Sequence, residues 1–254
     1  KLPTGYIEVV CSGLKILSEA ETPPFMIDDA ADVNEITRLK YRYLDLRRPQ
    51  LQSKLITRNK ICKSARDFLS QNNFLEIETP FLGKSTPEGA RDYLVPSRIN
   101  KGSFYALPQS PQLYKQLLMI AGFDRYYQIT KCFRDEDLRA NRQPEFTQID
   151  LEMSFAENER DVMEIMENLI AKIFGDVCGL KLNTPFKTLT YQQAMDRYGS
   201  DKPDTRFGLE LVDISDIALE CGFQVFSGAV KKGGSVRVIN AKGFNKLLSR
   251  RDID

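Results

Sequence analysis

The sequence of 254 residues balances 36 Lys and Arg against 35 Asp and Glu, which leaves a formal net charge of +1 at pH 7. This balance provides no overall field for holding nucleic acid, so any such contact would depend on local patches. A content of 42% hydrophobic and 28% charged residues predicts a soluble globular protein with enough core for one large domain or two.

Membrane spans and histidine chemistry are the next classes to be excluded. No apolar run approaches the roughly 18 residues of a membrane span, so we expect no membrane partner. The chain has no histidine, which excludes histidine acid–base catalysis and histidine-ligated zinc within it. Its five cysteines are widely spaced and form no CxxC pair, which favours free thiols in a reducing cytoplasm. Catalysis would then depend on carboxylates, lysines, arginines or a cofactor metal.

The first fifty residues divide into a strand-like part and a basic part. Residues 1–28 hold two short β-type runs, Tyr6–Val10 and Leu14–Leu17, before a Pro-Pro break. Two short strands rarely stand alone, so they favour the edge of a larger sheet; a two-strand appendage of the next domain is the alternative. Residues 29–50 look like a connector in which tyrosines alternate with basic residues. That composition suits contact with an RNA backbone, although it also occurs on solvated helix faces.

A helix, a strand and a turn follow. Apolar residues at helical spacing from Leu51 to Leu69 predict a helix that stops at Asn72-Asn73. Residues 74–79 have strand character and end at Pro80. Residues 86–89, Thr-Pro-Glu-Gly, have the chemistry of a turn and predict a surface loop.

The next helix is predicted to begin at Ser110, a good N-cap, with Pro111 as its first residue. Gln112 and Lys115 lie three residues apart and share one face. An amide and an ammonium beside the first turn suit a substrate carboxylate, since the helix dipole also favours an anion there; a solvated helix start is the alternative. Two leucines of another face are expected to point toward the core, Leu113 and Leu117.

Residues 126–155 predict a long antiparallel hairpin. The second half alternates strictly, which is the period of a half-buried strand, and Tyr126–Phe133 is suited to pair with it across a charged loop at 134–145. The side chains expected on the core face are Ile149, Leu151, Met153 and Phe155. The other face carries Gln148 and Asp150, and strands hold such groups rigidly enough to bind a small ligand. An ordinary meander with a solvated outer face is the alternative.

The remainder predicts a further helix and then a mixed segment. An apolar stripe runs through residues 158–174, with Gly175 placed just past the end of that helix. A short helix follows after Thr190 and is stopped by Gly199. Beyond Gly208, three runs have strand character: residues 212–215 (VDIS), 224–230 (QVFSGAV) and 236–240 (VRVIN).

Several phrases together resemble the class II aminoacyl-tRNA synthetases, most closely the bacterial aspartyl type. Phe-Arg-Asp-Glu at 133–136 and Arg-x-Pro-Glu-Phe-Thr-Gln-Ile-Asp at 142–150 resemble motif 2 of that class. The resemblance implies an α+β fold, in which an antiparallel sheet is flanked by helices. It assigns 1–28 to the end of an OB-fold anticodon-binding domain and 29–50 to a hinge. The class II catalytic core would cover 51–206, and an α+β insertion domain would begin at 207–254.

The same resemblance implies attachment of L-aspartate to tRNA(Asp) through an aspartyl-adenylate, with ATP and Mg²⁺. Arg134 would be the catalytic residue that holds the α-phosphate. The aspartate site would comprise Glu88, Ser110, Gln112, Lys115, Arg134, Gln148 and Asp150. The ATP site would comprise Arg134, Asp135, Glu136, Gln143 and Phe146. The tRNA acceptor end would meet Asp137, Leu138 and Arg139. A homodimer would form through motif 1 at Pro80.

The chain contains no stretch that resembles motif 3, and the resemblance places the Mg²⁺ ligands in that part. We therefore expect a fragment that is inactive by itself and holds no metal ligands. Two alternatives keep parts of this interpretation: a synthetase-like paralog of the aspartate–ammonia ligase type, or a non-catalytic RNA-binding module.

Overall fold

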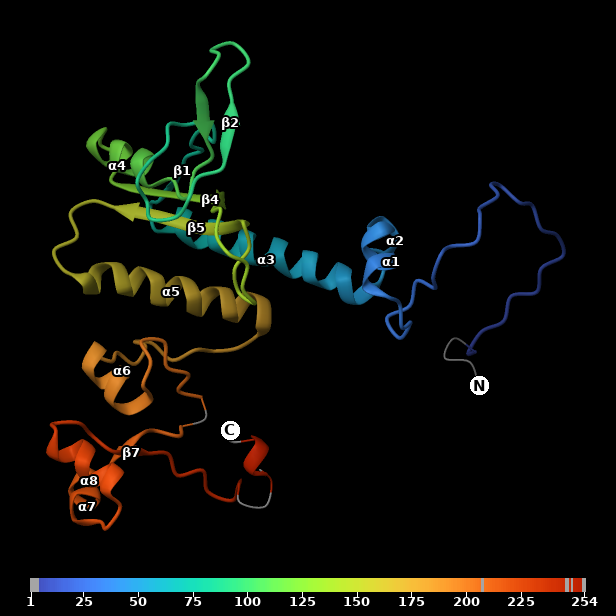
Figure 1. Ribbon diagram of the computed structural model, residues 1–254. Coiled ribbons are helices and arrows are strands. Elements are labelled where there is room, and N and C mark those ends of the chain that lie inside the picture. Colours follow the sequence, from blue (N-terminus) through green and yellow to red (C-terminus); the bar gives the residue numbers. More distant parts are fainter. Residues whose placement is uncertain (1–4, 207, 245–246, 248, 253–254) are drawn as a thin grey trace. The chain divides into compact units, whose positions relative to one another are not determined.

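A computed structural model describes residues 5–206, 208–244, 247 and 249–252 (Figure 1). The chain divides into two compact units, residues 1–184 and 185–254. This division falls before the predicted boundary at residue 206, so residues 185–206 lie in the second unit. Parts of the predicted 1–28 and 207–254 segments lie outside the described residues. The functional roles of the four predicted segments stay predictions.

The two N-terminal strands predicted from the sequence are absent from the described residues 5–28. These residues form no helix or strand, and the apolar side chains of the first run are exposed, with Tyr6 at 96% and Val10 at 93%. A strand requires a neighbour that pairs with its backbone groups, and no such neighbour lies beside this segment in the described residues. The strand prediction is therefore wrong for the structure.

The basic connector folds around one buried carboxylate. It contains α1 (Glu35–Lys40) and α2 (Arg42–Asp45). Asp45 is fully buried, and its carboxylate lies 2.6 Å from Arg42, 3.1 Å from Arg38 and 3.4 Å from Arg48. Burial raises the pKa of Asp45, but the ion pairs with the three arginines outweigh it, and the pKa lies below its ordinary value. These basic residues therefore have a structural role that composition alone does not reveal.

Replacing Asp45 by Asn is expected to lower the melting temperature by several degrees, because three guanidinium groups would lose their shared carboxylate. A carboxylate whose pKa is lowered on folding contributes stability above its unfolded pKa and loses it as pH falls through the folded pKa. The wild type should therefore lose this advantage over Asp45→Asn below about pH 3.8. Thermal unfolding followed by circular dichroism measures both effects. Asp67→Asn is the matched control, since Asp67 pairs with Lys63 in an exposed pair that contributes little.

The predicted hairpin is confirmed. Strand β4 (Arg125–Phe133) pairs antiparallel with β5 (Glu145–Met153) over their whole lengths. Strand β1 (Leu75–Glu76) joins the other edge of β4 in parallel, which gives the order β1-β4-β5. A separate two-stranded sheet pairs β2 (Leu94–Pro96) with β3 (Phe104–Ala106). The hairpin is the platform on which the first unit is assembled.

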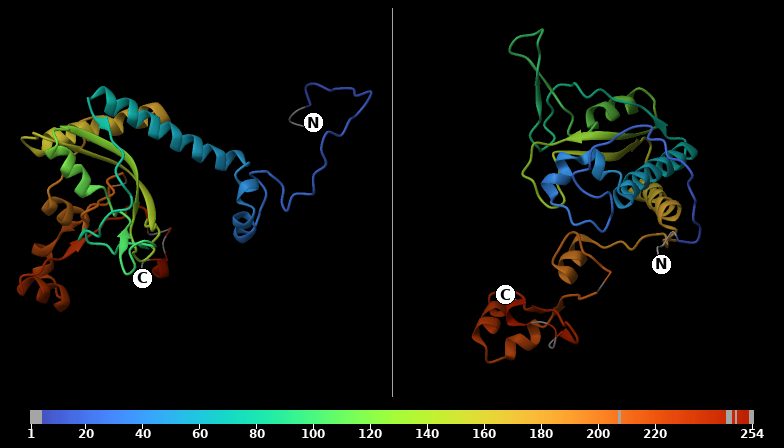
Figure 2. Two further views of the ribbon diagram at one scale, coloured as in Figure 1. Left: turned by 90° about the horizontal axis from the view of Figure 1, so that it is seen from above. Right: turned by 90° about the vertical axis from the view of Figure 1, so that its right-hand side faces the viewer.

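Helices cover both faces of this platform. Helices α3 (Pro49–Gln71) and α5 (Glu159–Cys178) lie side by side against one face, and α4 (Gln112–Ile120) lies against the other (Figure 2). The buried core between α3, α5 and the hairpin contains Ala65, Leu69, Phe74, Tyr127 and Leu169, and the partly buried residues that pack against it include Ile149, Leu151 and Met153. The alternation predicted for β5 therefore sets its buried face correctly as far as Met153. Phe155 is a correction, because the strand ends before it and its side chain is 88% exposed at a positive φ of 58°.

Helix α4 differs from its prediction in two respects. Its N-cap is Pro111, and Ser110 does not cap it. Leu113 and Leu117 are 47% and 52% exposed instead of buried. The reason is that α4 packs through Lys115 onto the polar face of the hairpin, and this turns the leucine stripe outward.

Helix ends follow local chemistry elsewhere. Helix α3 stops at Asn72 as predicted. Helix α5 begins with an Asn158–Asp161 capping box and continues through Gly175, because the left-handed residue that ends it is Gly179 at φ 66°. The predicted end at Gly175 is therefore wrong.

The second unit contains α6 (Tyr191–Tyr198), which ends at Gly199 as predicted. It also contains β6 (Val212–Asp213), α7 (Ser215–Glu220), α8 (Gln224–Lys231), β7 (Arg237–Val238) and a 3₁₀ turn at Arg250–Asp252. Strands β6 and β7 fall within two of the predicted runs and pair with each other. The run at 224–230 is helical instead of a strand, because short apolar runs do not distinguish the two and α8 packs against α7. Across the described chain, every helix is too short or too polar to cross a bilayer.

Candidate active site

The outward face of the hairpin is lined by polar side chains from both strands. The register sets Gln128 opposite Asp150 and Thr130 opposite Gln148. Gln128 and Thr130 are only 5% and 3% exposed, so this face is covered instead of solvated. The alternation of β5 predicted its residues on this face, whereas Gln128 and Thr130 of β4 were not predicted to lie on it. Period-two alternation along β4 was the signal that could have identified them.

Lys115 of α4 lies over this face between two carboxylates. Its ammonium is 3.1 Å from Asp150 Oδ1 and 3.1 Å from Glu152 Oε2. The side chains of Lys115 and Asp150 are each 11% exposed. Asp150 Oδ2 is buried, and no hydrogen-bond partner for it occurs among the described residues. Since buried polar atoms are nearly always paired, this oxygen is a place where a ligand ammonium would be held.

The pKa shifts of the pair follow from burial and contact. Burial raises the pKa of the Asp150 carboxyl, and the ion pair with Lys115 offsets only part of that rise. Burial lowers the pKa of Lys115, but its contacts with Asp150 and Glu152 outweigh it and leave the pKa above its ordinary value. Lys115 is therefore a positive charge held at the site at neutral pH.

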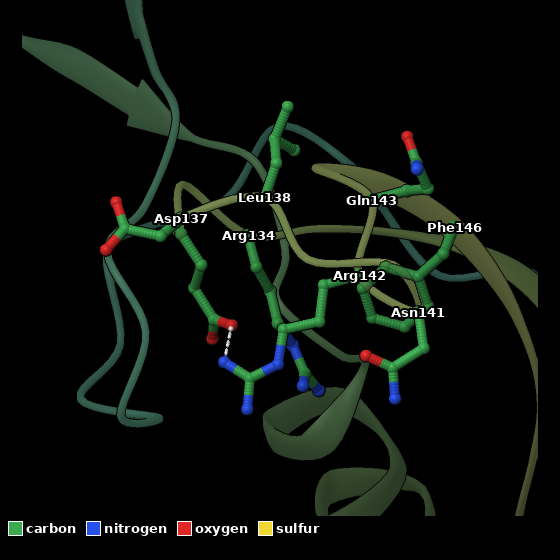
Figure 3. Close-up of a pocket in the computed structure, with 8 residues that line it drawn as sticks. Arg134, Asp137, Leu138, Asn141, Arg142, Gln143 and Phe146 are labelled. Atoms are coloured by element: carbon green, nitrogen blue, oxygen red, sulfur yellow. Dashed lines mark hydrogen bonds and ion pairs between the residues drawn. The ribbon is translucent and has the colours of Figure 1, made fainter. Parts of the chain in front are cut away.

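A cavity of about 340 Å³ lies at the loop end of the hairpin (Figure 3). Its lining residues are Arg134, Glu136, Asp137, Leu138, Asn141, Arg142, Gln143 and Phe146. The Arg134 guanidinium lies 5.0 Å from the centre of the Phe146 ring, and its Nε is buried without a hydrogen-bond partner among the described residues. An aromatic ring and a planar cation with a free donor suit a ligand that carries both a flat base and a phosphate.

The structure brings most of the predicted ATP residues to this cavity. The exception is Asp135, which is not among its lining residues: its backbone N–H donates to the Arg91 carbonyl oxygen at 3.0 Å. Of the predicted tRNA contacts, Asp137 and Leu138 line the cavity and Arg139 does not. Arg142 and Glu136 form an ion pair of 3.1 Å that was not predicted from the sequence. That contact crosses a loop, where no periodic spacing indicates which residues meet.

Glu88 and Ser110 meet in a smaller cavity of about 30 Å³, whose lining also includes Pro80. The Ser110 hydroxyl donates to Glu88 Oε2 at 2.7 Å, and the Thr86 hydroxyl donates to Oε1 at 2.9 Å. Gln112 begins α4 one turn before Lys115. The predicted aspartate residues therefore divide among three places: one around Glu88, one around Lys115 and Asp150, and the cavity that Arg134 lines.

A buried thiol supports the hairpin face. Cys132 Sγ donates to Gln148 Oε1 at 3.1 Å and has no exposed surface. Burial, with the nearby Asp150 charge, raises the pKa of the Cys132 thiol to about 11. The thiol is therefore neutral at physiological pH and acts as a hydrogen-bond donor.

We expect Cys132 to resist alkylation in the folded protein, because a thiol that is neutral and buried is a poor nucleophile. Cys11 and Cys178 are exposed and serve as internal controls. Iodoacetamide at pH 7.5, followed by peptide mass spectrometry, should modify both exposed thiols well before Cys132. Modification of all three at similar rates would contradict the burial of Cys132, and denaturant should abolish its protection.

The sequence of this chain is similar to known proteins over its whole length. A family model described as tRNA synthetases class II (D, K and N) matches residues 34–246. The chain is 63% identical over 254 residues to the aspartate–tRNA ligase of Ruminiclostridium cellulolyticum, covering 100% of this chain and 42% of that protein. It is 63% identical over 253 residues to the aspartate–tRNA(Asp/Asn) ligase of Symbiobacterium thermophilum, again covering 100% and 42%.

A solved structure supports the same assignment. A protein from Leishmania major Friedlin, described as an aspartyl-tRNA synthetase, matches with a TM-score of 0.55 and 28% identity, over 62% of this chain and 31% of that one. The chain spans less than half the length of the curated relatives described above. The family match, the whole-chain identity and the hairpin platform agree, and the chain belongs to the class II tRNA synthetases of the D, K and N group.

Proposed function

We propose that this chain carries part of the active site of an enzyme that activates L-aspartate with ATP and transfers it to tRNA(Asp). One observation carries the proposal: a single hairpin presents Asp150, which pairs with Lys115 of α4, and also borders the Arg134–Phe146 cavity. The names of the curated relatives support the choice of aspartate. The cytoplasm remains the proposed location.

Aspartate would be held by charge complementarity. The buried ammonium of Lys115 suits a carboxylate side chain and would repel a cationic one, which disfavours lysine as substrate. The free Oδ2 of Asp150 would accept from the α-ammonium. The remaining proposed contacts come from Glu88, Ser110, Gln112 and Gln148.

ATP would occupy the cavity at the loop end. Phe146 would stack on the adenine, and Arg134 would hold the α-phosphate and the aspartate α-carboxylate together. The remaining proposed ATP contacts come from Asp135, Glu136 and Gln143. The α-carboxylate oxygen attacks the α-phosphorus, a phosphorus–oxygen bond forms, and pyrophosphate leaves. Catalysis then consists mainly of positioning and of neutralising the phosphate charge.

Three parts of the proposal rest on the family alone. Mg²⁺ would screen the phosphates, but no three His, Cys, Asp or Glu residues in the described part of the chain are grouped to hold a metal ion. No residue here is therefore assigned to it. The acceptor end of tRNA would meet Asp137, Leu138 and Arg139. A homodimer would form at Pro80, which is exposed in the monomer.

The test is ATP–pyrophosphate exchange by the full-length protein with aspartate, asparagine and lysine offered separately. Exchange with aspartate alone is the expected result. Exchange with asparagine or lysine but not aspartate would overturn the substrate assignment. No exchange with any of the three would favour a non-catalytic RNA-binding module. Exchange without transfer to tRNA(Asp) would favour a paralog of the aspartate–ammonia ligase type.

A further inference from the structure

The segment that connects β3 to α4 lies beside the loop that carries Glu88. Backbone hydrogen bonds join the two segments at both ends of the loop. Before the loop, Gly83 and Ala106 exchange hydrogen bonds of 3.2 and 2.9 Å; after it, the Leu107 N–H donates to the Tyr93 carbonyl oxygen at 2.9 Å. The connecting segment then reads Pro-Gln-Ser-Pro. Proline has no backbone N–H, so regular pairing cannot extend along this segment to the middle of the loop.

The side chain of Gln109 takes the place of that missing backbone. Its Oε1 accepts from the Ala90 N–H at 3.0 Å, and its Nε2 donates to the Ala90 carbonyl at 2.9 Å. These two hydrogen bonds are the same pair that the backbone N–H and C=O of an antiparallel strand would form with Ala90. Nε2 also donates to Asp92 Oδ1, and Ser85 donates to the other oxygen of that carboxylate. With only 2% of Gln109 exposed, water cannot easily replace these bonds.

The loop that Gln109 holds connects both parts of the proposed site. Glu88 lies within this loop, and its carboxylate accepts a hydrogen bond from the hydroxyl of Ser110, the residue directly after Gln109. At the far end of the loop, the Arg91 carbonyl accepts from the backbone N–H of Asp135, which follows Arg134. The position of this loop therefore sets where the Glu88 carboxylate lies relative to the Arg134 cavity.

We propose that Gln109 is a positioning residue that fixes residues 85–92 and so holds Glu88 at the aspartate site. The inference rests on the proposed function for the identity of the substrate. The contact itself rests on three hydrogen bonds of a buried amide, whose Nε2 donates two and whose Oε1 accepts one. Gln109 is absent from the site predicted from the sequence, because an amide in a proline-rich connector has no distinguishing pattern.

The test replaces Gln109 by Met, which keeps the volume and removes the donors and the acceptor. Gln116→Met is the matched control, since Gln116 is exposed on α4. Amide hydrogen exchange of residues 85–92 in the full-length protein should become about tenfold faster in Gln109→Met and stay at the wild-type rate in the control. The KM for aspartate should rise about tenfold while kcat changes little, because a positioning residue outside the reacting atoms affects binding first.

Each outcome decides the proposal. Loop exchange within twofold of wild type would overturn the role of Gln109 in fixing the loop. Faster loop exchange with an unchanged KM for aspartate would overturn the link to Glu88. Gln109→Glu provides a second variant that keeps the acceptor but cannot donate, and it should resemble Gln109→Met. If the wild-type protein showed no aspartate-dependent activity, the proposed function would fail and with it the aspartate assignment. The hydrogen exchange would still decide whether Gln109 holds the loop.

Discussion

Replacing Arg134 by Gln should lower aspartate-dependent ATP–pyrophosphate exchange by roughly 100- to 1000-fold, the usual effect of losing one preorganised donor in a transition state. The guanidinium stacks on Phe146 at 5.0 Å, and its buried Nε has no partner in the described chain, so its bonding capacity is available for phosphate. Glutamine keeps part of the shape but has neither the charge nor the fork of donors. Initial rates at saturating ATP and aspartate measure the loss.

The control is Arg98→Gln, which removes a charge from the exposed turn between β2 and β3 and should leave the rate unchanged. Arg134→Lys separates charge from geometry. Lysine restores the positive charge without bidentate binding, so it should recover only a small part of the rate. Exchange by Arg134→Gln within tenfold of wild type would contradict a role for this residue at the α-phosphate.

Replacing Lys115 by Met should have the second large effect, which combines a loss of stability with a loss of aspartate binding. Breaking a buried ion pair costs roughly 3–5 kcal/mol, because the remaining charge is buried without a partner. Here that charge is Asp150, whose side chain is 11% exposed. Urea unfolding measures the stability loss, and the KM for aspartate measures the binding loss. Lys131→Met is the control, because the Lys131–Glu145 pair is exposed and worth about 1 kcal/mol or less.

A second variant separates the two effects. Lys115→Met with Asp150→Asn removes the buried charge of Asp150 and leaves only the Glu152 carboxylate, which is 33% exposed, so stability should largely return while aspartate-dependent exchange stays lost. The pH dependence provides a further check. Burial already raises the pKa of Asp150, and loss of Lys115 removes the contact that lowers it. A carboxyl whose pKa is raised on folding favours the folded state at low pH, so the deficit of Lys115→Met should shrink as pH falls through that raised pKa. A deficit that grows at low pH would contradict this account.

The sequence by itself determined the elements whose signals are local. The β4–β5 hairpin followed from period-two alternation, and the buried face of β5 was correct as far as Met153. The ends of α3 and α6 followed from Asn72 and Gly199, since a chain can turn out of a helix most easily at such residues. The loop phrase around Arg134 gave the family, and the residues of that phrase largely line the cavity.

Only the tertiary structure decided which side chains meet across long separations. Helix α4 has an apolar stripe that periodicity assigned to the core, yet the attraction of Lys115 for Asp150 turns Leu113 and Leu117 outward. The sequence predicted Ser110 as the N-cap of α4, but its hydroxyl donates a hydrogen bond to Glu88 instead. Gln109 acquires its role only because a loop nineteen residues earlier in the chain lies beside it. Periodicity reports the faces of single elements, whereas ion pairs and buried amides depend on partners that only folding brings together.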